Sequence, residues 1–138
     1  ATNDGVNPSF AGEFSYNPDS TPRTTAFYPL VLDSVPIQYG MSSQIRQAKI
    51  YATPGTHRIV TKASFAPHPF GDVIYAIVVL EANLMAGHDY LITGKLVNDK
   101  IEAWLEDART GERLPYSVSA KWANQPGSTV MPVIIPTR

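Results

Sequence analysis

The stretch Asp72-Val-Ile-Tyr-Ala-Ile-Val-Val-Leu-Glu81 decides the fold class. All eight residues from Val73 to Leu80 are apolar, and most of them are β-branched or aromatic. Such side chains suit a pleated strand better than a helix. Because no polar residue interrupts the run, it predicts a central strand that is covered on both faces. A membrane-spanning helix needs about 20 apolar residues, so the run does not predict one.

Three strand patterns follow this run, each separated from the next by a turn signal. Residues 90–97 alternate after a turn predicted at Gly87, and Asn98-Asp99 predicts a two-residue hairpin into the next strand. In residues 101–107 the inward positions are apolar and the outward positions carry Glu102, Trp104 and Glu106, which is typical of a half-buried strand. Gly111 predicts a further turn, and residues 114–122 predict the strand after it.

The first half of the chain also predicts extended structure. Residues 27–39 contain prolines at 29 and 36 and favour an edge strand or a bent connection. Residues 45–53 and 57–65 alternate on either side of Pro54-Gly55, a type II turn pair, and predict a hairpin. Residues 130–136 predict a final edge strand or an apolar C-terminal arm, because Pro132 excludes them from a sheet interior. No capped helix of ten or more residues is predicted.

Residues 1–26 are rich in Asn, Asp, Ser, Thr and Pro and predict an extended N-terminal arm. The arm is either a spacer or a loosely packed terminus that docks Phe10, Phe14 and Tyr16 on the sheet. Residues 27–138 then form the folded domain. The expectation is an all-β fold, a single antiparallel β-sandwich of about seven strands of the transthyretin or immunoglobulin type, with extended arms at both ends.

Bulk composition narrows the class of protein. A chain of 138 residues with 43% hydrophobic and 17% charged residues predicts one folded, soluble domain. The net charge is −1 and the 11 Lys and Arg residues are scattered, which excludes the basic stripe typical of nucleic-acid binding. Without cysteine the chain has no disulfide, Cys-ligated zinc or thiol nucleophile. It begins at Ala1 without Met, and a removed secretory signal or a cloned fragment explains this start equally well.

Two turn motifs and the strand after them carry a resemblance to a known family. The stretches Pro54-Gly-Thr-His-Arg-Ile-Val60, Ala86-Gly-His-Asp-Tyr-Leu-Ile92 and Ile101-Glu-Ala-Trp-Leu-Glu-Asp-Ala-Arg-Thr-Gly-Glu112 resemble small bacterial envelope lipoproteins with transthyretin-like or PEGA-like β-sandwich domains. The similar pattern runs from about residue 30 to 120. The resemblance implies an exported protein without catalytic residues. It also implies a lipid-bearing Cys, which this chain lacks and which would precede Ala1.

Three histidines are the candidate metal ligands: His57, His68 and His88. If the turns before His57 and His88 lie at one end of the fold, their imidazoles would meet each other together with Asp89 or Asp72. Zinc and copper sites use three or four convergent ligands, and turn capping is the alternative role for these side chains. We expect turn capping, with no metal and no cofactor.

Enzymatic motifs are equally sparse. There is no Gly-x-Ser-x-Gly elbow and no phosphate-binding Gly-rich loop. The candidate carboxylates for glycosidase chemistry are those of Glu102, Glu106 and Asp107. Glu102 and Glu106 share a strand face about 13 Å apart at ~3.3 Å per residue, wider than the roughly 5–10 Å of a catalytic pair. We therefore expect a solvated face and no enzyme activity.

The candidate binding residues are aromatic: Trp104, Tyr51 and Trp122. Trp104 and Tyr51 point to the outer side of their strands, where an exposed ring would stack on a sugar or anchor a protein. The alternative is that another segment covers Trp104.

Three functional hypotheses remain open. The first is a non-catalytic cell-envelope protein, periplasmic or attached to the outer membrane, which contacts another envelope protein through a free strand edge or an aromatic face. The second is a module that binds carbohydrate or a cell-wall polymer, and the third is a metal protein or small enzyme. A homo-oligomer formed through the C-terminal segment is also expected, and a cytoplasmic location remains open.

Overall fold

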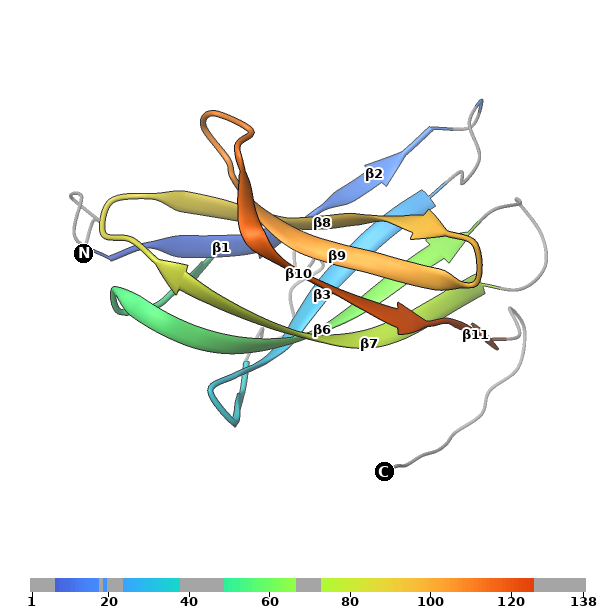
Figure 1. Cartoon of the computed structure of the whole chain (residues 1–138), viewed down its shortest axis with the longest axis horizontal. Helices are drawn as coiled ribbons and strands as arrows, with labels where there is room; N and C mark the ends of the chain where they lie inside the picture. Colours follow the sequence, from blue (N-terminus) through green and yellow to red (C-terminus); the bar gives the residue numbers. More distant parts are fainter. Residues whose placement is uncertain (1–6, 18, 20–23, 38–48, 67–72, 126–138) are drawn as a thin grey trace.

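The computed structural model describes residues 7–17, 19, 24–37, 49–66 and 73–125. In these ranges the chain forms two β-sheets and no helix, which confirms the all-β prediction (Figure 1). The two sheets face each other across one apolar core. The predicted C-terminal strand 130–136 lies outside the described residues, as do residues 45–48 of the predicted hairpin.

One sheet, called sheet A, has five strands in the order β10-β9-β8-β1-β5. Consecutive strands β8, β9 and β10 pair antiparallel, and the hairpin between β8 and β9 turns at Asn98, whose φ is 57°. The strands are β1 (Ser9–Gly12), β5 (Ile50–Tyr51), β8 (Asp89–Val97), β9 (Lys100–Asp107) and β10 (Arg113–Lys121).

The other sheet, called sheet B, is built on β6 and β7, whose antiparallel register runs from Gly55 opposite Leu84 to Phe65 opposite Ile74. Its order is β11-β7-β6-β3-β2, and β4 pairs with β3. The strands are β2 (Phe14–Tyr16), β3 (Thr24–Leu32), β4 (Val35–Pro36), β6 (Gly55–Ala66), β7 (Val73–Leu84) and β11 (Ala123–Gln125).

The core consists of the inward residues of both sheets, as the alternating sequence requires. The apolar run of residues 73–80 is buried mainly on one face, whereas burial of both faces was predicted. In β7 buried and exposed residues alternate, and Ile77 and Val79 on the outer face are 47% and 37% exposed. The prediction that both faces are covered is therefore wrong for the described residues. The core contains Phe10, Phe27, Ile59, Phe65, Val78, Leu80, Leu84, Ile92, Ile101 and Leu105.

The N-terminal segment differs from the expected arm. Strand β1 lies between β8 and β5, and it pairs parallel with β8 from Ser9 opposite Asp89 to Gly12 opposite Ile92. The chain then crosses to sheet B, where β2 pairs with β3. Sheet A is consequently mixed, which corrects the prediction of a purely antiparallel fold. Phe10 is fully buried, so burial of this side chain drives the insertion.

The predicted hairpin of residues 45–53 with 57–65 is not formed by the described residues. Strand β5 pairs with β1 in sheet A, whereas β6 pairs with β3 and β7 in sheet B. Pro54-Gly55 therefore marks a crossing between the sheets, with Gly55 at a φ of 128°. The described residues form eleven strands, whereas about seven were expected. Four of the eleven, β2, β4, β5 and β11, are three residues or shorter.

Candidate functional site

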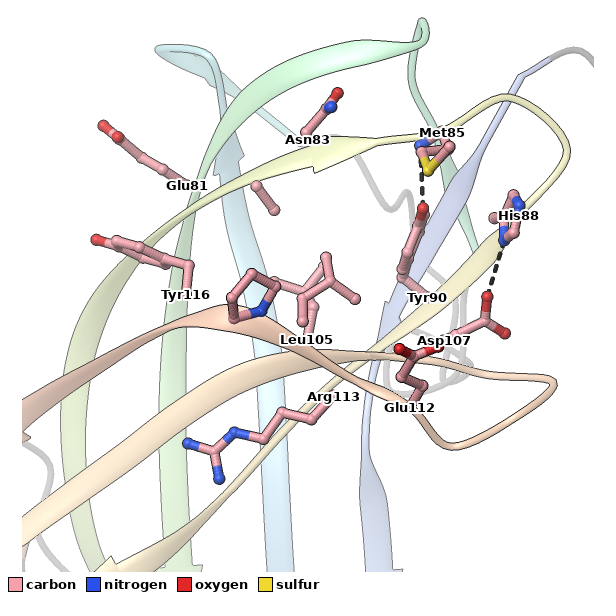
Figure 2. A pocket seen from close by; sticks show the side chains of 13 residues that line it. Glu81, Asn83, Met85, His88, Tyr90, Leu105, Asp107, Glu112, Arg113 and Tyr116 are labelled. Atoms are coloured by element: carbon pink, nitrogen blue, oxygen red, sulfur yellow. Dashed lines mark hydrogen bonds and ion pairs between the residues drawn. The ribbon is translucent and has the colours of Figure 1, made fainter.

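A pocket of about 430 Å³ lies between the end of β7 and the start of β10 (Figure 2). Residues from β7, the β7–β8 turn, β8, β9 and β10 line it: Glu81, Ala82, Asn83, Met85, His88, Tyr90, Leu105, Asp107, Glu112, Arg113, Leu114, Pro115 and Tyr116.

The pocket lies at the seam where β10 of sheet A runs close to β7 of sheet B. On the side away from β6, strand β11 pairs with β7 only at Val73 to Tyr75. From Ala76 to Leu84 no described strand pairs with that edge of β7. On the facing side the register of β10 shifts between Arg113 and Ser117, where Pro115 has no N–H to donate. The register shift falls in the part of β10 that lines the pocket.

Apolar side chains form the inner wall of the pocket. Leu105 is 1% exposed and Tyr90 is 5% exposed, so both are fixed by the core behind them. The Tyr90 hydroxyl accepts a hydrogen bond of 3.0 Å from the backbone N–H of Met85, which ties the end of β7 to β8 (Figure 2). The wall is therefore preformed.

A histidine and an aspartate form the polar end of the pocket. The Nδ1 atom of His88 lies 2.8 Å from Oδ2 of Asp107, and the other Asp107 oxygen accepts hydrogen bonds from the N–H groups of Arg109 and Thr110 (Figure 2). The His88 hydrogen bond and these N–H donors lower the pKa of Asp107 below 3.8. The carboxylate is thus charged at neutral pH and holds the β9–β10 turn.

The rim of the pocket presents exposed side chains. Tyr116 is 42% exposed and Met85 is 57% exposed, while Glu81 and Glu112 add negative charge. Arg113 points away from the cavity (Figure 2). An apolar wall with a few polar groups at one end is the usual character of a site for a small molecule or a short peptide.

The structure does not bring the three predicted aromatic residues together. Trp104 is on the outer face of sheet A but only 8% exposed, because the Arg113 guanidinium lies 3.8 Å from its ring centre. Tyr51 is 52% exposed at the far edge strand of the same sheet. Trp122 packs against the core and donates its indole N–H to the Asn98 carbonyl at 3.2 Å. Trp104 is therefore covered, and Arg113 of β10 is a described residue that stacks on its ring.

The histidines take separate partners in the described residues. Nδ1 of His57 lies 2.5 Å from Oδ2 of Asp33, whose other oxygen accepts the N–H of Arg58. Burial alone would lower the pKa of His57, but its hydrogen bonds to Asp33 and to the Thr53 carbonyl raise it above 6.5. The Arg58 N–H and His57 together lower the pKa of Asp33.

No group of three or more metal-ligating side chains occurs within the described ranges. His68 and Asp72 lie outside them. Asp89, the other expected ligand, instead accepts a hydrogen bond of 2.6 Å from the Ser9 hydroxyl.

The carboxylates on the outer face of sheet A have partners of their own. Glu102 forms an ion pair of 2.9 Å with Arg113, and Glu106 accepts the indole N–H of Trp104 at 3.1 Å. These contacts give both groups a role in supporting β9 and β10.

Sequence reasoning missed the pocket-forming residues Met85, Tyr90 and Tyr116. The one local signal was Pro115 near the start of a predicted strand, which indicates disturbed pairing.

Comparisons of the chain with known proteins found no relative. No protein-family model matches the chain, and no curated protein or solved structure matches it either. Within the described part of the chain, no helix has the length and apolar character needed to cross a membrane.

Proposed function

We propose that this chain is a non-catalytic interaction protein of the bacterial cell envelope, with a sandwich of the transthyretin or immunoglobulin type. It binds an extended segment of another envelope protein along the free edge of β7. The observation that carries the proposal is that no described strand pairs with the outer edge of β7 from Ala76 to Leu84, where an apolar pocket lies beside the end of the strand.

The mechanism is strand addition. An unpaired edge exposes N–H and C=O groups in a row, and an extended segment satisfies them while its alternate side chains enter adjacent pockets. Here the segment would lie against β7 and place one apolar side chain between Leu105 and Tyr116. Its backbone supplies most of the affinity, and the pocket supplies the sequence preference.

The pocket favours one kind of segment. Its wall at Leu105 and Tyr90 accepts an apolar or aromatic side chain, and Glu81 and Glu112 at the rim favour a positive charge nearby. We expect segments with alternating apolar residues flanked by Lys or Arg.

A displayed library of random seven-residue peptides tests this proposal. Selection on the immobilised chain is expected to enrich peptides of this pattern, and Tyr116→Glu is expected to weaken their binding at least tenfold. Val97→Lys is the matched control, because Val97 is an exposed strand residue of sheet A that does not line the pocket. A library without enrichment, or equal weakening by both substitutions, contradicts the proposal.

Location in the envelope rests on the resemblance to envelope lipoproteins and has its own test. The coding sequence upstream of Ala1 is expected to encode a signal peptide that ends in Cys. An upstream sequence that encodes neither a signal peptide nor such a Cys removes this part of the proposal and leaves the edge-binding part standing.

Cell-wall polymer is the second candidate ligand. It is favoured by Tyr116, a partly exposed ring beside carboxylates at the pocket mouth, which is a common arrangement for stacking on sugars. Titration with soluble peptidoglycan fragments, followed by tyrosine and tryptophan fluorescence, separates the two. A saturable change that Tyr116→Ala abolishes would favour the polymer, and no change would remove it.

A further inference from the structure

His57 lies where the chain has just crossed from sheet A to sheet B. It is the third residue of β6, and its side chain is only 11% exposed. Both nitrogens of its ring meet oxygen atoms. Nδ1 lies 2.5 Å from Oδ2 of Asp33, and Nε2 lies 2.6 Å from the carbonyl oxygen of Thr53. The ring therefore joins the turn between β3 and β4 to the segment that connects β5 with β6.

Neither of these oxygens is able to supply a proton to the ring. A backbone carbonyl is only an acceptor, and so is an ionised carboxylate. The Asp33 carboxylate is ionised at neutral pH, because the Arg58 N–H and the His57 ring lower its pKa below 3.8. Both ring nitrogens must therefore donate, and only the doubly protonated, positively charged imidazole does so.

The surroundings of the ring favour this charge. Burial lowers the pKa of His57, but its hydrogen bonds to Asp33 and to the Thr53 carbonyl outweigh this effect and raise the pKa above 6.5. Among the described residues, Asp33 is the charged group that faces the ring. Arg58, the next residue of β6, pairs with Glu81 of β7 at 3.3 Å. The residue opposite His57 on β7 is the uncharged Ala82.

Loss of one ring proton breaks one of the two hydrogen bonds. The bond to Asp33 is the stronger of the two, because a hydrogen bond to a charged group is about twice as strong as one between neutral groups. The neutral ring therefore keeps its proton on Nδ1 and turns Nε2 into an acceptor that faces the Thr53 carbonyl. The Thr53 hydroxyl, 3.3 Å from Nε2, is able to donate to it once the carbonyl has moved away.

The Thr53 carbonyl helps to hold the end of β5, the edge strand of sheet A in the described part of the chain. Strand β5 pairs with β1 through two residues, and Ala52 next to it donates its N–H to the Pro8 carbonyl at 3.1 Å. So short a strand opens locally at low cost, and each further tie slows its opening. Loss of the bond between His57 and Thr53 should therefore loosen this edge.

We propose that His57 is a pH-operated clamp on the crossing between β5 and β6. The clamp is closed while both ring nitrogens carry a proton. It opens at Thr53 when Nε2 loses its proton as the pH rises, and the turn between β3 and β4 stays tied to His57 in both states. The clamp uses none of the side chains that line the pocket, so it stands or falls independently of the binding function.

Nuclear magnetic resonance of the His57 ring nitrogens, recorded over a range of pH, tests the proton positions. Below about pH 6.5 the ring is expected to be mostly doubly protonated. At higher pH the proton that leaves is expected to be the one on Nε2. A ring that is already neutral below about pH 6.5, or a neutral ring that keeps its proton on Nε2, overturns the proposal.

Amide hydrogen exchange tests the opening at Thr53. After correction for base catalysis of exchange itself, the Ala52 N–H is expected to exchange about fivefold faster above the His57 titration than below it, the effect of about one hydrogen bond. The Asp33 N–H donates to the Arg58 carbonyl at 2.9 Å and is the internal control, which should show no such step. Equal steps at both amides, or no step at Ala52, contradict the clamp.

Asp33→Asn is the matched variant. It keeps an oxygen for the Arg58 N–H and places an NH2 group against Nδ1 of His57. A donor at that position makes Nδ1 the acceptor, so the neutral ring keeps its proton on Nε2 and its bond to the Thr53 carbonyl. The step in exchange at Ala52 is therefore expected to disappear in this variant. A step of unchanged size would show that the His57 ring is not its cause.

Discussion

Replacing Gly12 by alanine tests the crossing of the N-terminal segment from sheet A, where β1 pairs with β8 and β5, to sheet B. A Cβ atom at this position would lie 1.8 Å from the Phe27 carbonyl oxygen and 2.7 Å from its carbon, both backbone atoms of β3. Ordinary contacts begin at 3.4 Å, so β1 and β3 would have to separate by about 1.6 Å. The substitution therefore acts on the crossing from sheet A to sheet B.

The expected loss of stability follows from the contacts that hold the crossing together. Glu13 donates its N–H to the Ile92 carbonyl and accepts the Phe27 N–H, each at 2.9 Å. Overpacking costs about 1–3 kcal/mol, and each backbone hydrogen bond contributes about 1 kcal/mol net. We expect Gly12→Ala to lower the free energy of unfolding by roughly 3–5 kcal/mol. With a urea slope of about 2 kcal/mol/M, the midpoint falls by about 1.5–2.5 M.

The assay is urea unfolding followed by tryptophan fluorescence, since Trp104 is buried. Gly111→Ala is the matched control: its Cβ meets nothing within 4 Å, but its φ of 78° makes alanine cost about 1–2 kcal/mol. A Gly12→Ala midpoint equal to that of the unsubstituted chain, or above that of Gly111→Ala, refutes the insertion.

Three further predictions concern single side chains. Arg113→Ala is expected to expose Trp104, shift its emission to longer wavelength and lower stability by about 1 kcal/mol, and an unchanged emission spectrum contradicts the stacked geometry. Thr61→Val is expected to leave stability unchanged or raise it by up to about 1 kcal/mol, because the Thr61 hydroxyl is buried without a partner among the described residues, and calorimetry measures the change. The raised pKa of His57 stabilises the fold fully below about pH 6.5, and this contribution is lost as pH rises through the folded-state pKa. The lowered pKa values of Asp33 and Asp107 give stability that is lost below about pH 3.8. His57→Gln should therefore flatten the neutral limb of the profile of melting temperature against pH. It should reduce the acid limb only by the part of the Asp33 shift that His57 causes, and the part from Asp107 should remain.

Local patterns predicted the second half of the fold well. The strands β7, β8 and β9 follow the alternation and the turns that the sequence shows, and Gly87, Asn98 and Gly111 all have positive φ. Such turns depend on the residues within them, so one sequence is enough to find them.

The pairing of strands that lie far apart in the chain could not be predicted from the sequence. Strand β1 is four residues long, and its partners β8 and β5 lie far along the chain, so no local period marks it. For the same reason Pro54-Gly55 predicted a hairpin, whereas the chain uses these residues to change sheets. Strand partners are chosen by burial of Phe10 and its neighbours in the whole fold.

The pocket could not be predicted because it depends on which edges remain unpaired. From the sequence alone, Tyr116 is predicted to be an ordinary strand residue. Its place in the pocket follows only from the register shift in β10 and from the edge of β7 with which no described strand pairs. The sequence left open whether Trp104 is an exposed anchor or is covered, because the residue that stacks on it, Arg113, lies on the next strand.

Residue-resolved amide hydrogen exchange of β7 is the most direct test of edge binding. The free chain and its complex with a library-selected peptide are compared. Exchange is expected to slow at least tenfold at alternate residues between Ala76 and Leu84, those whose N–H groups point away from β6, and to stay unchanged in β5 at the far edge of sheet A. Equal exchange rates along β7 with and without the peptide would contradict strand addition at this edge.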